Sequence, residues 1–343
     1  MIQQAIAGAV SGTLPPWESP ELGSRSTQDL IAEIRSLARQ KNAVILAHNY
    51  QVPEVQEVAD HVGDSLGLSR EAQKTDADIV VFCGVHFMAE SAKILNPQKR
   101  VFLPSLAAGC SLADSITPES LEEWKERYPE HRVVTYINST AEVKALSDVC
   151  CTSANAASVV RYVESDKILF TPDRNLGNWV ARQVPEKDIV IYDGVCPTHD
   201  VLRSASVESS LSQTRARHSG GAAEVVVIAH PECREDVVAL AHEVCSTSGM
   251  VAAVERHPSA KSFVVATEWG LIYQLKKRFP DREFVAADGC IGCRLHCPYM
   301  KMIDLDSTLR SLREEVHEIE VPEDVQVGAR RALERMMEVP RDH

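Results

Sequence analysis

The chain has 343 residues, of which 44% are hydrophobic, 25% are charged and ten are cysteines. This length and composition predict a folded protein of two or three domains and exclude a wholly disordered chain. No apolar run reaches the ~20 residues that span a bilayer, so we expect no membrane partner. The net charge of −13 argues against a nucleic-acid partner.

Two features of the N-terminal segment bear on the compartment. Met1–Val10 is apolar but contains no Lys or Arg, so it does not resemble a secretory signal. Residues 1–26 are rich in Pro, Gly and Ser and predict a flexible leader. We therefore expect a cytoplasmic protein with reduced thiols, in which the cysteines serve as metal ligands, reactive groups or small core residues.

An α/β pattern begins after this leader. Apolar residues at near-helical spacing predict a helix over 27–40, and the aliphatic run Ala43–Ala47 predicts a strand that ends in polar His48. Two further apolar runs, 79–82 and 101–103, predict the next strands. Strands that alternate with helices in this way indicate an α/β fold.

The same succession occurs twice more along the chain. The second and third copies predict strands at 133–138, 167–170 and 189–191, and at 225–232, 263–266 and 284–286. A turn with hydroxyl side chains follows the first strand of each copy, and cysteine follows the third strand. The strand end and the turn are 17 residues apart in each of the pairs His48 and Ser65, Tyr136 and Ser153, His230 and Thr247. Chance similarity between β–α–β units is the alternative, but the equal intervals favour a threefold internal repeat.

The repeat has a geometric consequence for the site. In α/β units the loops at the carboxyl ends of the strands bind ligands. Three units around a pseudo-threefold axis would direct these loops to one central site. Each unit would bring a polar strand end, a hydroxyl turn and a cysteine.

The cysteines beyond the third strands are the candidate metal ligands. The pair Cys290 and Cys293 is compatible with zinc, with redox chemistry or with an iron–sulfur cluster. Structural zinc uses four protein ligands, usually from close pairs, so a 4Fe–4S cluster held by three thiolates fits better. Such a cluster leaves one iron free to act as a Lewis acid. Repeat position selects Cys110 and Cys196, and it indicates Cys290 as readily as Cys297. The other five are interpreted as core residues: Cys83, Cys150, Cys151, Cys233 and Cys245.

These segments carry a family resemblance. The chain resembles the quinolinate synthase family, the A protein of de novo NAD biosynthesis, over about residues 40 to 305 and in the family's order. The matching segments are His48–Glu54, Ala59–Ser65, Val81–Glu90, Tyr136–Ser139, Thr152–Ala156, Pro172–Gly177, Cys196–His199, His230–Cys233, Ser246–Thr247 and Cys297–Lys301.

The resemblance implies the architecture and the cofactor. It implies three similar three-layer αβα domains, 27–108, 109–194 and 195–303, related by a pseudo-threefold axis around a central 4Fe–4S cluster. The segment 304–343, with helices expected at 307–316 and 322–337, is predicted to pack back on the first domain. The cluster ligands would be Cys110, Cys196 and Cys297. Cys290 and Cys293 would form a redox pair, or one of them would compete with Cys297.

The resemblance also implies the reaction. The family condenses iminoaspartate with dihydroxyacetone phosphate to quinolinate, phosphate and water. L-aspartate oxidase or aspartate dehydrogenase, as a source of the unstable imine, would be a transient partner. The alternatives are a non-catalytic iron–sulfur or zinc sensor on the same scaffold, and a redox protein that uses Cys290 and Cys293.

Roles for the polar residues follow from the resemblance and from the chemistry. Anionic substrates need hydrogen-bond donors, and these would be Ser65, Ser153, Ser246 and Thr247. His48, Tyr136 and Asn138 would line the pocket, and His230 and Glu232 would bind substrate as well as move protons. Glu232 is predicted to be the principal general base beside His230, with His199 near the cluster and Tyr50 and Tyr136 as acids. For each hydroxyl turn alone, helix capping is the competing explanation. Lys144, in a helical segment, is interpreted as solvated.

Overall fold

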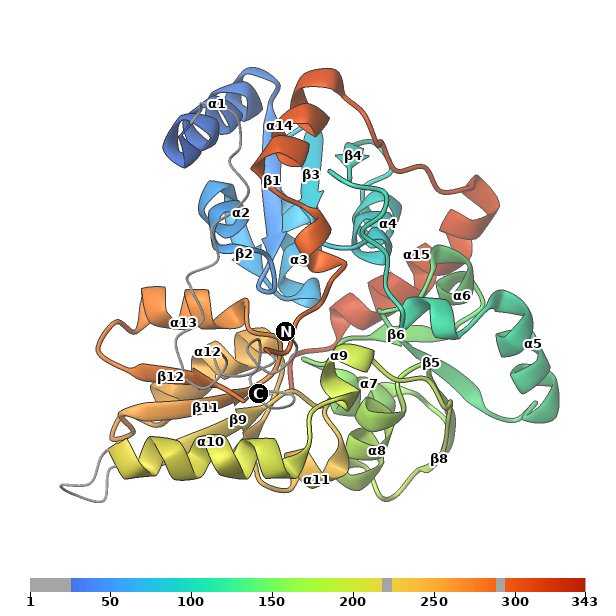
Figure 1. Ribbon diagram of the computed structural model, residues 1–343. Helices are drawn as coiled ribbons and strands as arrows, with labels where there is room; N and C mark the ends of the chain where they lie inside the picture. Colours follow the sequence, from blue (N-terminus) through green and yellow to red (C-terminus); the bar gives the residue numbers. More distant parts are fainter. Residues whose placement is uncertain (1–25, 218–223, 288–293, 343) are drawn as a thin grey trace, which may run out of the picture.

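The computed structural model describes residues 26–217, 224–287 and 294–342, and it consists of three α/β units (Figure 1). Each unit has a parallel four-stranded sheet, and the strand orders are β2-β1-β3-β4, β6-β5-β7-β8 and β10-β9-β11-β12. The order is therefore the same in all three sheets. The expected α/β fold with three similar units is confirmed. The leader, except Ser26, and the pair Cys290 and Cys293 lie outside the described residues.

The first unit begins where Ser26 and Asp29 form a capping box at the N-terminus of α1. Its elements are α1 (Thr27–Gln40), β1 (Ala43–His48), α2 (Pro53–Val58), β2 (His61–Gly63), α3 (Ser65–Lys74), β3 (Ile79–Cys83), α4 (His86–Leu95) and β4 (Arg100–Phe102). The two central strands, β1 and β3, are almost wholly buried aliphatic runs, as expected for strands covered on both faces.

The second unit follows the 3₁₀ helix η1 (Ala113–Ser115) and repeats the order of helices and strands. Its elements are α5 (Pro118–Arg127), β5 (Arg132–Tyr136), α6 (Ala141–Ala145), β6 (Val149–Cys151), α7 (Ala156–Tyr162), β7 (Lys167–Thr171), α8 (Arg174–Gln183) and β8 (Asp188–Ile191). The third unit follows α9 (Pro197–Asp200) and repeats the order again. Its elements are α10 (Ser204–Arg217), β9 (Val225–Ala229), α11 (Glu235–Val238), β10 (Glu243–Val244), α12 (Thr247–Arg256), β11 (Ser262–Ala266), α13 (Leu271–Arg278) and β12 (Glu283–Ala286).

Strand register explains the interval of 17 residues. His48 at the end of β1 pairs with Gly63, and Tyr136 at the end of β5 pairs with Cys151. The short edge strands β2, β6 and β10 thus end beside the first strand of each unit, and the hydroxyl turn follows at once. The strand end and the hydroxyl side chain are consequently neighbours at the same sheet edge. The sequence pattern did not predict these edge strands, because runs of two or three residues have no detectable period.

The C-terminal segment joins the first two units. After the 3₁₀ helix η2 (Met300–Met302), α14 (Leu305–Glu314) packs on α1 and β3. Helix α15 (Glu323–Glu338) contacts α4 of the first unit, but packs more extensively on α6 and β6 of the second (Figure 1). The apolar side of this last helix therefore faces two units, where the sequence led us to expect one. Across the described ranges, no helix has the length and apolar character needed to cross a membrane.

Candidate functional site

One central pocket gathers side chains from the strand ends of all three units. It encloses about 660 Å³ of space between atoms, including open solvent at its mouth. The predicted site residues that line it are His48, Tyr50, Ser65, Cys110, Tyr136, Asn138, Ser153, Cys196, His199, His230, Glu232, Thr247 and Cys297. Ser246 does not line this pocket; it lines a neighbouring cavity, which Ser153 also reaches. The fold thus brings most of the predicted residues, which are dispersed along the chain, to one pocket.

Chain topology accounts for the position of the pocket. In each sheet the connection from the first strand leads to one side and the connection from the second central strand leads to the other. Ligands bind at such a switch point, outside the carboxyl ends of the strands. His48 ends β1, Tyr136 ends β5 and His230 directly follows β9, so each unit places a polar side chain at its own switch point.

In the first and third units, the residue that caps a helix is followed by a hydroxyl residue that lines the central pocket. Asp64 caps α3 by accepting from the Gly67 amide at 2.8 Å, and Ser246 caps α12 by accepting from Gly249 at 3.2 Å. Ser65 and Thr247, the first residues of these two helices, are left to face the pocket. Capping thus explains Ser246, whereas Ser65 and Thr247 lie where helix N-termini favour an anion.

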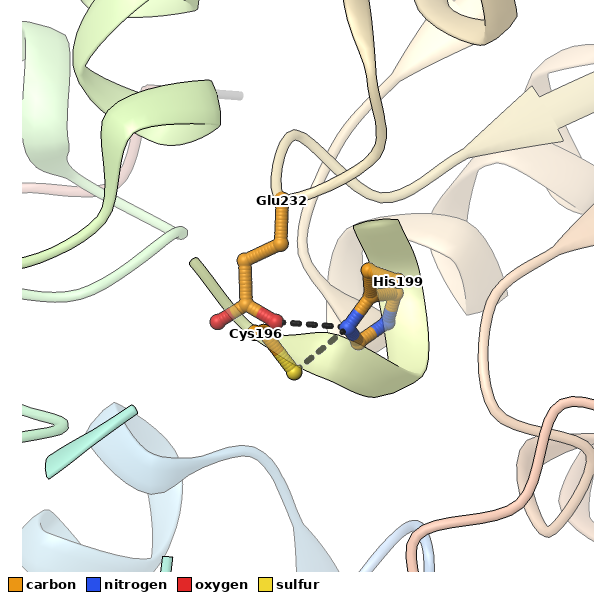
Figure 2. A group of neighbouring side chains, drawn as sticks. All are labelled: Cys196, His199 and Glu232. Atoms are coloured by element: carbon orange, nitrogen blue, oxygen red, sulfur yellow. Dashed lines mark hydrogen bonds and ion pairs between the residues drawn. The ribbon is translucent and has the colours of Figure 1, made fainter. Parts of the chain in front are cut away.

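Glu232 and His199 form a close, deeply buried contact in the pocket. The Glu232 Oε2 atom lies 2.7 Å from Nδ1 of His199, and both side chains are almost completely buried. Figure 2 shows Glu232, from the loop after β9, pointing toward the imidazole on α9, with Cys196 at the start of that helix. His230 stacks on His199 with ring centroids 4.8 Å apart.

A chain of hydrogen bonds continues beyond this pair. If the His199 Nδ1–H donates to the Glu232 carboxylate, His199 Nε2 accepts from the Thr267 hydroxyl at 2.9 Å. The oxygen of Thr267 then accepts from the Tyr50 hydroxyl at 2.5 Å. This arrangement links the phenol of Tyr50 to the carboxylate of Glu232. Thr267 was not predicted, because a single Thr after an apolar strand has no distinctive pattern.

Burial and hydrogen bonding set the protonation states in the pocket. Burial alone raises the pKa of Glu232, but the nearby imidazoles and the hydrogen bonds from His199 and Tyr136 outweigh it, so the pKa lies below its ordinary value. Burial lowers the pKa of His48 to about 4 and that of His230 to about 3. The pocket therefore holds an ionised carboxylate and two neutral imidazoles near neutral pH.

The lowered pKa of His48 predicts a pH-dependent loss of stability. Below pH 6.5 the unfolded chain takes up a proton at His48, whereas the folded chain does so only near pH 4. The free energy of unfolding should therefore fall as the pH drops from 6.5 to 4, with His48 contributing about 2 kcal/mol of the loss by pH 5. Urea unfolding of wild type and His48→Asn at pH 7 and pH 5 measures the difference, since Asn keeps an acceptor for the Tyr50 amide. Equal losses in the two proteins would contradict this assignment.

The three predicted cluster cysteines lie around the same pocket. Cys110 precedes η1, Cys196 precedes α9 and Cys297 precedes η2, so one thiol follows each sheet. Burial raises the pKa of all three thiols, that of Cys110 to about 12. These thiols are therefore protonated near neutral pH, and a metal ion that bound them would have to displace the protons. Cys196, His199 and Glu232 also present their ligand atoms within 4.8 Å of one another, as a potential metal site.

The five cysteines interpreted as core residues are buried. Their exposed fractions are 0–2% for Cys83, Cys150, Cys151, Cys233 and Cys245. None of the five lines the central pocket, so packing explains them.

A buried ion pair positions the third thiol. Glu268 Oε1 accepts from the Cys297 amide at 3.4 Å and lies 2.9 Å from Lys301 Nζ. Lys301 in turn donates to the backbone carbonyl of Tyr50. The Cys297 loop is thus tied to the end of β11 and to the loop after β1. Lys301 belongs to a recognised segment, but its partner Glu268 was missed because only tertiary contact reveals it.

Comparison with known proteins gives matches over most of the chain. The profile of the family described as Quinolinate synthetase A protein matches residues 32–338. Quinolinate synthase of Thermodesulfovibrio yellowstonii is 49% identical over 307 residues, covering 90% of this chain and 97% of the relative. Quinolinate synthase of Geobacter metallireducens is 50% identical over 310 residues, with coverages of 90% and 97%.

Among solved structures, a UDP-GlcNAc 2-epimerase from Neisseria meningitidis covers 76% of this chain and 69% of its own, with 12% identity and a TM-score of 0.15, too low to carry an argument. The family profile and the two relatives span nearly the whole chain, including the three cysteines and the polar strand ends of the pocket. The chain therefore belongs to the quinolinate synthase family of enzymes.

Proposed function

We propose that this enzyme condenses iminoaspartate with dihydroxyacetone phosphate to form quinolinate, phosphate and water in NAD biosynthesis. The observation that carries the proposal is the pocket itself, in which three thiols, a carboxylate–imidazole pair and hydroxyls at helix N-termini meet. Anionic groups require such donors, and the dehydrations require groups that accept and return protons. Family membership supports the same activity.

Cys110, Cys196 and Cys297 would hold a 4Fe–4S cluster. The donor set fits this group, because each of the three units contributes one soft thiol ligand to a largely buried pocket. When bound, a three-thiolate cluster supplies one iron without a protein ligand, which is a Lewis acid. We further propose that the units, with boundaries 27–108, 109–194 and 195–303 and with 304–343 packed on the first two units, are related by a pseudo-threefold axis through this centre.

The side chains of the pocket divide between binding and proton transfer. Ser65, Ser153 and Thr247 would donate to substrate carboxylates or phosphate, and Asn138 would add an amide. The Asn138 Nδ2 atom lies 3.4 Å from Glu232 Oε1, so the same amide also orients that carboxylate. Ser246 would act through its helix, because it caps α12 outside the pocket.

Proton transfer would run along the hydrogen-bonded chain described above. Substrate would give a proton to the Tyr50 oxygen while Tyr50 passes its own proton to Thr267 and Thr267 passes its own to Nε2 of His199. Glu232, which accepts from Tyr136, would stabilise the resulting positive charge on His199, and the reverse sequence would return the proton to substrate. His230 would place its Nε2 atom, 3.2 Å from the Ser153 hydroxyl, against the substrate.

Anaerobic assay of the purified enzyme tests the proposal. Iminoaspartate and dihydroxyacetone phosphate should yield quinolinate and phosphate in equal amounts, and the protein should contain about four irons per chain. Iron-bound protein that forms no quinolinate would favour the sensor hypothesis instead. The proposal also places the enzyme in the cytoplasm, in transient contact with L-aspartate oxidase or aspartate dehydrogenase as a source of the imine.

A further inference from the structure

Arg341, near the C-terminal end, forms a two-point ion pair with a carboxylate of the pocket. Its Nη1 and Nη2 atoms lie 2.6 and 2.9 Å from the two oxygens of Asp64, which is only 7% exposed. Asp64 caps α3 and lines the central pocket. Burial alone raises the pKa of Asp64, but the hydrogen bonds and charge of Arg341 outweigh burial and hold it below its ordinary value.

The second unit holds the segment that carries Arg341. The carboxylate of Asp342 accepts from the amides of Ala157 and Ser158 at 3.2 and 2.8 Å, at the N-terminus of α7. The Asp342 amide donates to the Ala154 carbonyl at 2.7 Å. These bonds fix the backbone on the second unit while the Arg341 guanidinium reaches α3 of the first.

The third unit contacts the same carboxylate. The Ser246 hydroxyl, at the N-cap of α12, lies 3.3 Å from Asp64 Oδ2. The three helices α3, α7 and α12 occupy corresponding places in the three units, and each begins beside a hydroxyl assigned to substrate binding. Asp64, Arg341 and Asp342 therefore connect the three helix N-termini.

The charges around the pocket indicate how the Arg341–Asp64 pair affects the binding of anions. The central pocket is lined by the carboxylates of Asp64 and Glu232, and Ser153 and Ser246 line the neighbouring cavity. Within the described residues that line either one, Arg341 is the single Arg or Lys. An Asp64 carboxylate without a cation would repel any anion that approaches the N-terminus of α3.

We propose that Arg341 determines the affinity of this enzyme for its anionic substrates, because its guanidinium neutralises Asp64 at the edge of the pocket. The inference rests on the proposed function, since it concerns the dicarboxylate and phosphate groups of that reaction. Arg341 is a positioning residue, which acts through Asp64 and not on reacting atoms. Gly67 leaves room for the paired carboxylate, because a Cβ there would lie 3.1 Å from Asp64 Oδ1.

Four variants test the inference: Arg341→Met, Arg341→Lys, Asp64→Asn and the double variant Arg341→Met/Asp64→Asn. Arg341→Met should raise KM for both substrates and the Kd of quinolinate by about tenfold or more, with kcat and iron content close to wild type. KM and Kd of Arg341→Lys should lie between those of wild type and Arg341→Met, because Lys restores the charge without the two-point geometry. In the double variant both constants should return most of the way to the wild-type values, because Asn still caps α3 and no unpaired charge remains.

The double variant separates the electrostatic role from a structural one. If Arg341 served only to tie the chain together, removing Asp64 as well would not restore KM, and that result would overturn the proposal. If Arg341→Met fails to fold, the KM values of Arg341→Lys and of the double variant, each compared with that of Asp64→Asn, still show whether the charge of Asp64 controls the affinity. Arg313→Met, which removes an exposed Arg paired with Glu33, is the matched control.

The wild-type enzyme distinguishes this failure from failure of the proposed function. Wild type that makes no quinolinate contradicts the proposed function. Wild type that makes quinolinate, together with Arg341→Met of unchanged KM and Kd, contradicts only the role of Arg341.

Discussion

Replacing any one of Cys110, Cys196 and Cys297 by Ser should remove the proposed 4Fe–4S cluster, and with it the activity. A serine hydroxyl loses its proton far less readily than a thiol and is a poor ligand for iron, so only two thiolates would remain. Iron analysis of anaerobically purified protein should fall from about four per chain to below about one, and the brown absorbance should disappear.

The matched control is a buried cysteine outside the pocket. Cys83 is fully buried at the end of β3, where its thiol lies 3.8 Å from Thr308 Oγ1. Cys83→Ala should keep the iron and the activity and lower the free energy of unfolding by only about 1 kcal/mol, since one small group is lost from the core. Full iron content in any one of the three Cys→Ser variants would reject that residue as a ligand.

The internal repeat made much of the fold predictable. Aliphatic runs followed by polar residues located β1, β5 and β9, because buried parallel strands are continuous apolar segments. Their equal distance from the hydroxyl turns indicated corresponding positions in three units. The structure explains this equal distance, because the last residue of the first strand pairs with the last residue of the edge strand, just before the hydroxyl turn, in these sheets.

Residues that act through tertiary contacts were not predictable in the same way. Lys144 lies in a short helix and was expected to be solvated, but it is fully buried and donates to the Ser139 carbonyl. Asp64 and Arg341 are 277 residues apart, and Glu268 and Lys301 meet only because the chain returns to the end of β11. The sequence pattern contains the periods of helices and strands, whereas the contacts within these pairs depend on how distant segments of the chain pack against one another.

Glu232→Gln should reduce kcat by about 10²–10⁴-fold while substrate binding and the proposed cluster persist. Gln has the same shape but no charge, so it cannot stabilise a protonated His199 at the 2.7 Å contact. The amide oxygen can still accept from His199, and only the longer hydrogen bond from Asn138, at 3.4 Å, is lost, which preserves most of the local geometry. Because the effect is on charge, the expected signature is a large fall in kcat with little change in KM.

Glu235, three residues further along the chain at the start of α11, provides the control for this variant. Its side chain is 72% exposed and pairs with Arg182 outside the pocket, so Glu235→Gln should retain wild-type kcat and KM. Iron content and near-ultraviolet circular dichroism should match wild type in both variants. If Glu232→Gln turned over at the wild-type rate, the proton would have to pass through His230 or Tyr136 without this carboxylate, and the chain from Tyr50 to Glu232 would be structural only.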